Sequence, residues 1–193
     1  YVIGPSSETA FTVKANDNFS IVGKVKSEPV VDAVPGEDQI FSGDGAYIDA
    51  LQAQVDFDNL SIWAGKVHPA FGRASDVTPG LHGPDLADTY DLTDRLGGGV
   101  SYDFAALGFS NRLQASAFTV DRTILGESLF TNRGRLSLGD GGAGNTQGVS
   151  SVAAALDGCL GADTASCYDE GSVGYKLAAR YQKGGAGSDG NEL

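Results

Sequence analysis

Residues 46–72 read AYIDALQAQVDFDNLSIWAGKVHPAFG, and this stretch decides the fold. From Tyr47 to Phe57 most odd positions are apolar, and the even positions near the end are polar. This period of two predicts a strand with one apolar and one polar face. Asp58-Asn59 predicts a turn, and residues 60–67 predict the returning strand. The first strand is longer than a typical soluble strand of about 5–6 residues. It matches the roughly 9–11 residues of a tilted strand that crosses a bilayer.

The rest of the chain repeats this hairpin. Further strands are predicted at 9–16, 19–26, 99–104, 113–117, 149–157 and 172–182. Short turns alternate with long connections at 28–45, 69–96 and 122–148, and a further loop begins at 183. Short turns at one end and long loops at the other are typical of bacterial outer-membrane barrels. We therefore predict an all-β fold, a single domain over 1–193 that forms a transmembrane antiparallel up-and-down β-barrel with about eight strands.

Composition narrows the function classes. The net charge is -12, which argues against nucleic acid as a partner because phosphate binding needs a basic face. The 28 glycines are about twice the average usage and fit a turn-rich β chain. The sequence has no Met and no signal peptide, so we expect a processed chain or a part of a longer one. Because it stops in a loop-like segment, we expect an incomplete barrel.

Cys159 and Cys167 are the only cysteines. They enclose a short loop and lack the partners of a zinc site. In an exported protein this spacing predicts a disulfide on the turn side of the barrel. A disulfide implies an oxidising compartment such as the periplasm.

Catalytic, metal and cofactor motifs are not evident. Residues 139–144 match the glycine pattern of a dinucleotide loop, but the flanking strand and helix are missing. His68 and His82 are the only histidines and are interpreted as isolated loop residues. The acidic residues lack the regular spacing of a calcium loop. We therefore expect no enzyme activity, no metal and no cofactor.

The polar sides of the strands carry much of the basic charge. In a barrel these side chains face water inside the lumen, because a charge is costly on the lipid side. In a soluble sandwich they would form the solvent face. Lys66 is ambiguous, since strict alternation places it outward and a bulge at Gly65 would turn it inward. The predicted pore-lining residues are Lys14, Lys24, Lys26, Gln52, Gln54, Lys66, Arg112, Gln114, Lys176 and Arg180.

Residues 65–72, GKVHPAFG, resemble a segment that follows a strand in proteobacterial porins, including the phosphate-selective porin family. Residues 127–135 are similar to segments of porin-like outer-membrane proteins. The resemblance implies a trimeric diffusion pore of about sixteen strands, more than this chain shows.

Taken with the strand pattern, the resemblance predicts a porin of the bacterial outer membrane. Its partners would be membrane lipid and lipopolysaccharide, and it would pass small polar solutes or ions. An inserted loop is expected to narrow the lumen with Asp85, Asp88, Asp91 and Asp94, although the same loop could lie outside as a solvated lid. The alternatives are a small closed barrel that acts as an anchor or interaction protein and a secreted β-sandwich adhesin or binding module.

Overall fold

The computed structural model describes residues 2–31, 34–71, 91–164, 167, 171–188 and 190–192. Within them the chain forms strands and two short 3-10 helices. In chain order these are β1 (Val2–Ile3), β2 (Ser7–Lys14), β3 (Phe19–Pro29), β4 (Gln39–Ile40), β5 (Asp44–Phe57), β6 (Leu60–Val67), β7 (Arg95–Ala106), β8 (Phe109–Val120), η1 (Ile124–Gly126), β9 (Ser128–Phe130), η2 (Leu138–Asp140), β10 (Ser151–Leu160) and β11 (Val173–Tyr181).

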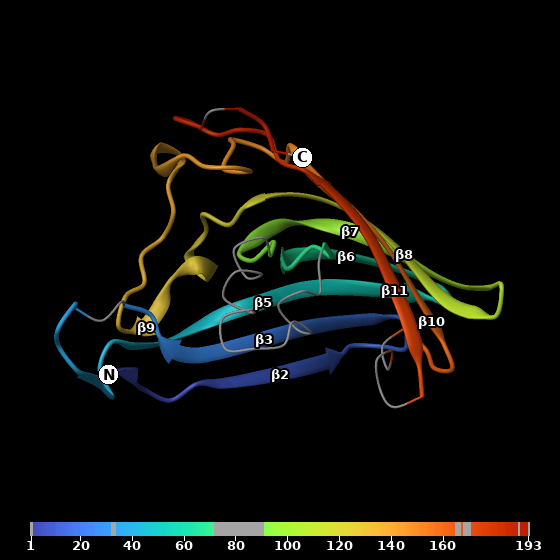
Figure 1. The fold of residues 1–193 in the computed structure, drawn as a ribbon, viewed down its shortest axis with the longest axis horizontal. Helices are drawn as coiled ribbons and strands as arrows, with labels where there is room; N and C mark the ends of the chain where they lie inside the picture. The colour runs from blue at the N-terminus through green and yellow to red at the C-terminus, as the bar shows by residue number, and fades with distance from the viewer. Residues whose placement is uncertain are drawn as a thin grey trace.

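One antiparallel sheet dominates the structure. Its strands follow the order β2, β3, β5, β6, β7, β8, β10 and β11, and β9 adds to one part of β5. The sheet curls, so that β11 passes in front of β3 and β5 (Figure 1). The predicted all-β, up-and-down arrangement of about eight strands is confirmed. The sheet is not closed, because no pairing among the described residues joins β2 to β11. No helix among those residues is long and apolar enough to span a membrane.

Short turns and long connections lie at opposite ends of the sheet (Figure 1). Asn16 closes the β2–β3 turn, because its side-chain oxygen accepts hydrogen bonds from the amides of Asn18 and Phe19 at 2.9 and 2.8 Å. Leu107 and Gly108, both at positive φ, form the two-residue β7–β8 turn, as expected where the turn must match the strand twist. The predicted alternation of turns and loops is therefore present in the described chain.

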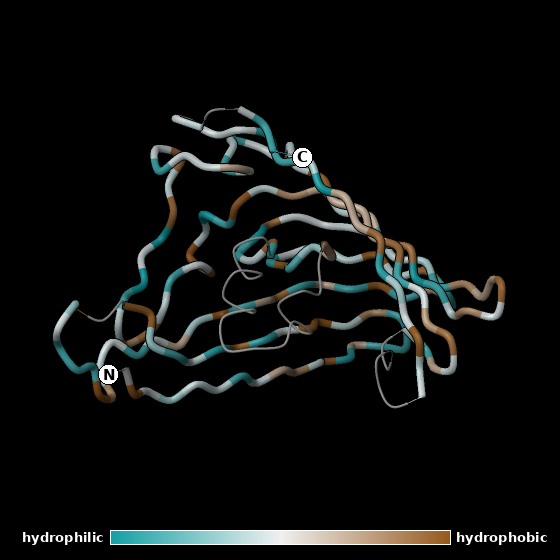
Figure 2. The backbone as a smooth tube through the Cα atoms, in the orientation of Figure 1, coloured by the Kyte–Doolittle hydropathy of each residue, from teal (hydrophilic) through white to brown (hydrophobic). Residues whose placement is uncertain are grey.

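Strand register sorts the side chains into two faces. We call the side that bears Ser61, Ser101 and Gln114 the polar face, and the side that bears Leu60, Tyr102 and Leu113 the apolar face. Tyr102 is 48% exposed and Leu113 is 49% exposed, whereas Ser101 is only 8% exposed. The alternation of polar and apolar residues is visible along the strands in Figure 2. The polar face is thus the shielded side of the curled sheet.

The predicted facing of Tyr47 is wrong. Pairing between β3 and β5 shifts at Lys24 and Val25, which leaves Asp49 as an extra residue in β5. This bulge reverses the alternation, so Tyr47 pairs with Lys26 and lies on the polar face. The sequence pattern does not show this reversal because Tyr47 and Ile48 are adjacent apolar residues, so either one can be assigned to the apolar face.

Aromatic rings cover three strand glycines through cross-strand pairs. The pairs are Phe11 with Gly23, Trp63 with Gly99, and Tyr175 with Gly158. A Cβ at each glycine would lie 2.1–2.4 Å from the nearest ring atom. Glycine is therefore required for the ring to lie flat on the strand, an arrangement that pins register in designed β-sheets.

The predicted disulfide is confirmed. Cys159 and Cys167 are bonded, with a Cα–Cα distance of 5.6 Å. The bond lies at the β10–β11 connection, which is on the turn side of the sheet, as predicted. Closing so short a loop stabilises a fold by about 2–3 kcal/mol in the chain-entropy model.

Candidate functional site: the polar face of the sheet

The structure brings the predicted wall residues together, with Lys66 as the one exception. A single register row crosses the sheet through Lys14, Ser20, Gln54, Trp63, Gly99, Ser116, Ala153 and Arg180. The same register places Lys24, Lys26, Gln52, Arg112, Gln114 and Lys176 on this polar face.

A second row on the polar face alternates in charge. Asp103, Arg112, Asp157 and Lys176 lie directly opposite one another on β7, β8, β10 and β11. Arg112 Nε and Nη2 contact the two oxygens of Asp103 at 2.7 and 2.8 Å. Lys176 Nζ lies 3.0 Å from Asp157 Oδ1. Opposite charges facing each other across strands stabilise the pairing.

The lysines of β3 are also paired. Lys24 Nζ lies 2.9 Å from Glu8 and 3.8 Å from Asp49, and Lys26 Nζ lies 2.8 Å from Glu28. The side chains of Lys24 and Lys26 are about one-third exposed, so these pairs face a partly hydrated space.

These pairs change the expected electrostatics. The sequence predicted a basic wall that faces the acidic residues of an inserted loop. Instead, carboxylates on the strands themselves lie beside most of the wall bases. Arg180 is next to an acid of the C-terminal segment, since its Nη2 lies 3.8 Å from Glu192. The polar face is therefore close to balanced in charge. Sequence reasoning missed this because the pairing depends on cross-strand register.

Lys66 is fully buried. The β5–β6 and β6–β7 registers continue without a shift, so the alternative bulge at Gly65 does not occur. Lys66 shares its row with Leu51 and Leu96 rather than with the polar face. Its Nζ lies 2.7 Å from Asp94 Oδ1 and 3.4 Å from Asp121 Oδ2, and donates to Leu125 O at 3.1 Å. Lys66 therefore serves as an anchor for the segment that follows β8.

Asp94 belongs to this anchor. Arg133 Nη2 contacts the same Asp94 oxygen at 2.7 Å. Burial alone would raise the pKa of Asp94, but hydrogen bonds from Lys66 and Arg133 outweigh it and hold the pKa below its usual range. Of the other predicted constriction acids, Asp91 is half-buried, and Asp85 and Asp88 lie outside the described residues. Asp94 is thus neutralised by two bases.

The connection between β8 and β10 crosses back over the sheet. Its strand β9 pairs with β5 at residues 45–47, where β6 has already ended. Arg133 then lies 3.9 Å above the ring of Tyr47, whose hydroxyl donates to Glu28. The sequence predicted only a long connection over residues 122–148. Arg133, one of two arginines in the 127–135 segment, is the signal that could have indicated an anchored loop.

His68 is not an isolated loop residue. Its Nε2 lies 3.3 Å from Asp49 Oδ1 and 3.1 Å from the Asp49 carbonyl oxygen. Burial opposes the charged imidazolium, but the Asp49 hydrogen bond and charge dominate and raise the pKa of His68. The other histidine, His82, lies outside the described residues.

The β6–β7 connection is held against the polar face at both of its described ends. Phe71 and Leu92 pack with Phe118 and Ala153, which belong to that face. The Arg180 guanidinium lies 4.6 Å above the Phe71 ring. The connection therefore leaves β6 and returns to β7 on the shielded side of the sheet.

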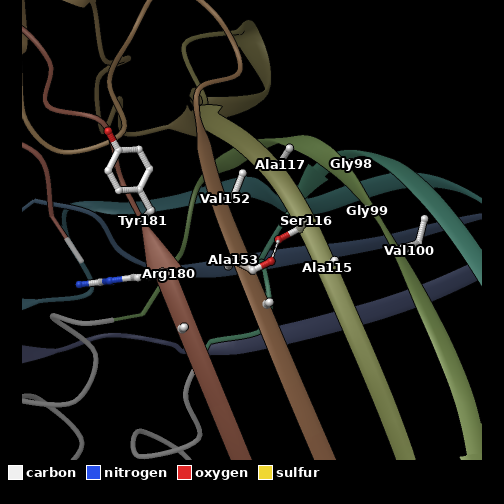
Figure 3. A pocket seen from close by; sticks show the side chains of 12 residues that line it. Gly98, Gly99, Val100, Ala115, Ser116, Ala117, Val152, Ala153, Arg180 and Tyr181 are labelled. Carbon is white, nitrogen blue, oxygen red and sulfur yellow. Dashed lines mark hydrogen bonds between the residues drawn. The ribbon is translucent and has the colours of Figure 1, made fainter.

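A hollow of about 610 Å³ lies over β7, β8, β10 and β11 (Figure 3). Small apolar-face residues, among them Gly98, Ala117 and Ala154, form much of its lining. In Figure 3, the Arg180 side chain points away from Val152 and Tyr181. The hollow offers few polar groups to orient a solute, so the polar face is the better candidate site.

The described residues contain no group of three or more His, Cys, Asp or Glu side chains placed to hold a metal ion. The chain matches no protein-family model, no curated protein and no solved structure.

Proposed function

We propose that this chain forms the wall of a bacterial outer-membrane porin, a water-filled channel for passive diffusion of small polar solutes or ions. The main support for this proposal is that apolar side chains lie on the exposed face of the sheet and polar side chains on the shielded face. Tyr102, Leu113 and Leu177 of the apolar face are 48–65% exposed, while Ser20 and Ser101 of the polar face are only 6% and 8% exposed. A soluble protein places such apolar side chains inside, whereas a bilayer rewards their outward placement.

Strand length supports the same conclusion. β3, β5, β7 and β8 contain 11, 14, 12 and 12 residues. A tilted strand needs roughly 9–11 residues to cross the hydrocarbon layer. Unpaired strand edges cost several kcal/mol per group in lipid. The proposed barrel is therefore completed by strands that pair with β2 and β11.

The proposed mechanism is diffusion past a charge-balanced wall. A lumen lined by one sign of charge would favour counter-ions. Pairs such as Arg112–Asp103 and Lys176–Asp157 leave little net field along the strands. The width of the lumen and the hydration of the solute then matter more than the charge of the wall. The proposed channel therefore passes small polar solutes with only a weak preference among ions.

The β6–β7 connection is the proposed constriction. Its described ends, Phe71 and Leu92, pack on the polar face, which supports this proposal. The porin-like segment 65–72 supplies one of these contacts, since Phe71 packs against the buried cluster of Leu92, Phe118 and Ala153. The relationship to proteobacterial porins, the trimeric assembly and the lipopolysaccharide contacts belong to the same proposal.

Conductance in a planar lipid bilayer tests the proposal. The purified protein is expected to produce discrete current steps that grow with salt concentration. A small closed barrel, filled by its own side chains, would insert without such steps. A secreted β-sandwich would stay monodisperse without detergent and would not insert. Either outcome contradicts the porin assignment.

A further inference from the structure

Two phenylalanines at the long-loop end are exposed in an unfavourable backbone conformation. Phe41 is 70% exposed at φ 46°, and Phe130 is 92% exposed at φ 71°. Bulky residues rarely occupy this left-handed region, which Gly and Asn adopt at lower cost. Neither ring gains burial within the chain in return. Leu107 has the same backbone conformation because a two-residue hairpin turn requires it, but Phe41 and Phe130 lie outside such turns. Outliers of this kind occur at binding sites, where an external contact offsets the strain.

The two phenylalanines lie in neighbouring loops. Phe130 pairs with Gly45 at the start of β5, and Phe41 lies just before that strand. A hollow of about 320 Å³ joins the two loops, because its lining includes Val31, Val34 and Gln39 from one loop and Thr131 from the other. The Thr131 amide donates to Asp44 O at 3.3 Å. We call the exposed apolar residues of these two loops the Phe41 patch; they are Val31, Val34, Ile40, Phe41, Leu129 and Phe130, of which Val31 and Val34 line the hollow.

The first of the two loops is acidic. Its described residues include Glu37, Asp38 and Asp44, and residues 30–44 contain no Lys or Arg. The two arginines of the other loop, Arg133 and Arg135, are paired with Asp94 and Glu127. Glu37 and Asp38 line the hollow itself. An anionic lipid headgroup would be repelled by these carboxylates, whereas a basic group would be attracted.

The position of the patch also argues against lipid. The apolar face extends along β5 to about Ile48, which pairs with the exposed Val25. Gly45, the partner of Phe130, is three residues further along β5. At the rise of a strand this is about 10 Å beyond the apolar band.

We propose that the Phe41 patch is a docking site for a basic, amphipathic polypeptide segment. The partner's apolar side chains cover the two phenylalanines, and its Lys or Arg side chains lie beside Glu37 and Asp38. Aromatic anchors surrounded by complementary charge are the usual basis of such contacts. This docking does not depend on whether the sheet conducts solutes.

Fluorescence anisotropy with a short labelled amphipathic peptide made of Leu and Lys tests the proposal. The double variant F41N/F130N removes both rings and places Asn in a backbone conformation that Asn tolerates. We expect binding to weaken at least about tenfold, as for loss of hot-spot residues, while the thermal midpoint does not fall. The control F57N removes a phenylalanine that is 51% exposed at the opposite end of β5 and should bind as the wild type does.

A charge pair of variants separates docking from general adsorption to an acidic protein. E37Q/D38N should weaken binding and its salt dependence. D17N/D58N removes the same charge from the turn end of the sheet, where both residues are exposed. This control variant should bind the peptide as the wild type does. Equal affinity in all variants would overturn the proposal. It would also be overturned if a peptide of Leu and Glu bound equally well, or if F41N/F130N abolished binding to anionic vesicles but not to the basic peptide.

Discussion

At the residue scale, Lys66 is the most constrained charge in the described chain. Its side chain is fully buried, and so is that of its partner Asp121. Burying a charge is costly unless it is paired and hydrogen-bonded, and here two carboxylates and a carbonyl oxygen provide the partners. The pairing ties the end of β6 to the connections on either side of β7 and β8.

Replacing Lys66 with Met should strongly destabilise the fold. The change leaves Asp121 buried without its cation, and loss of one partner of a buried ion pair typically costs about 3–5 kcal/mol. Thermal unfolding in detergent should show a markedly lower midpoint. Lys14→Met is the matched control, because Lys14 is exposed, and its midpoint should stay close to wild type. An equal effect of the two substitutions would contradict the proposed role of Lys66.

His68 gives the protein a predictable pH dependence. Because Asp49 raises its folded pKa, the pair contributes stability below the ordinary value of about 6.5 and loses it as pH rises through the raised pKa. The effect is modest, since one-third of the His68 side chain is exposed. As the pH rises through the raised pKa of His68, the thermal unfolding midpoint should fall in the wild type but not in His68→Gln. A parallel fall in both proteins would show that another group is responsible.

At the element scale, the sheet follows the sequence pattern where alternation is clean and departs from it where geometry intervenes. The alternation in β8 and β11 correctly predicted which residues share a face, because successive residues of a regular strand point to opposite faces of the sheet. The bulge at Asp49 and the crossing of β9 over to β5 were not predictable. Both depend on contacts between segments far apart in the chain, which local periodicity does not encode.

The packing of aromatic rings on strand glycines can be tested by substitution of one glycine. In Gly158→Ala, the new Cβ would lie 2.1 Å from the Tyr175 ring, so the ring must move. The ring then loses its hydroxyl bond to Asn111, now 2.7 Å long. We expect a loss of roughly 1–3 kcal/mol, as for overpacked sites. Gly148→Ala is the control, since no atom lies within 4 Å of its Cβ position. Equal unfolding midpoints for the two variants would contradict the packing role of Gly158.

At the scale of the whole molecule, the sequence predicted the division of the sheet into an apolar and a polar face. It also predicted the alternation of short turns and long loops. The candidate site was predictable only in part. Residues such as Arg112 and Lys176 lie on the predicted face, but their acidic partners, Asp103 and Asp157, were not anticipated. Charge balance is a property of register across strands, and composition shows only that the chain as a whole is acidic.

The proposed constriction predicts a change in pore size. Deleting residues 74–88 keeps Phe71 and Leu92, which hold the ends of the connection on the polar face. If the connection narrows the lumen, single-channel conductance should rise by several-fold while the salt dependence remains. Unchanged conductance would place the connection outside the lumen as an external lid.

The most direct test of the central claim, that the apolar face contacts lipid and the polar face contacts water, uses tryptophan fluorescence in lipid vesicles. Trp63 is the only tryptophan and lies on the polar face. Its fluorescence should be quenched by aqueous iodide and not by brominated lipid. In W63F/L113W the single tryptophan moves to the apolar face, where Leu113 is 49% exposed, and the quenching should reverse. Quenching of the relocated tryptophan by iodide, with no effect of brominated lipid, would contradict the membrane barrel.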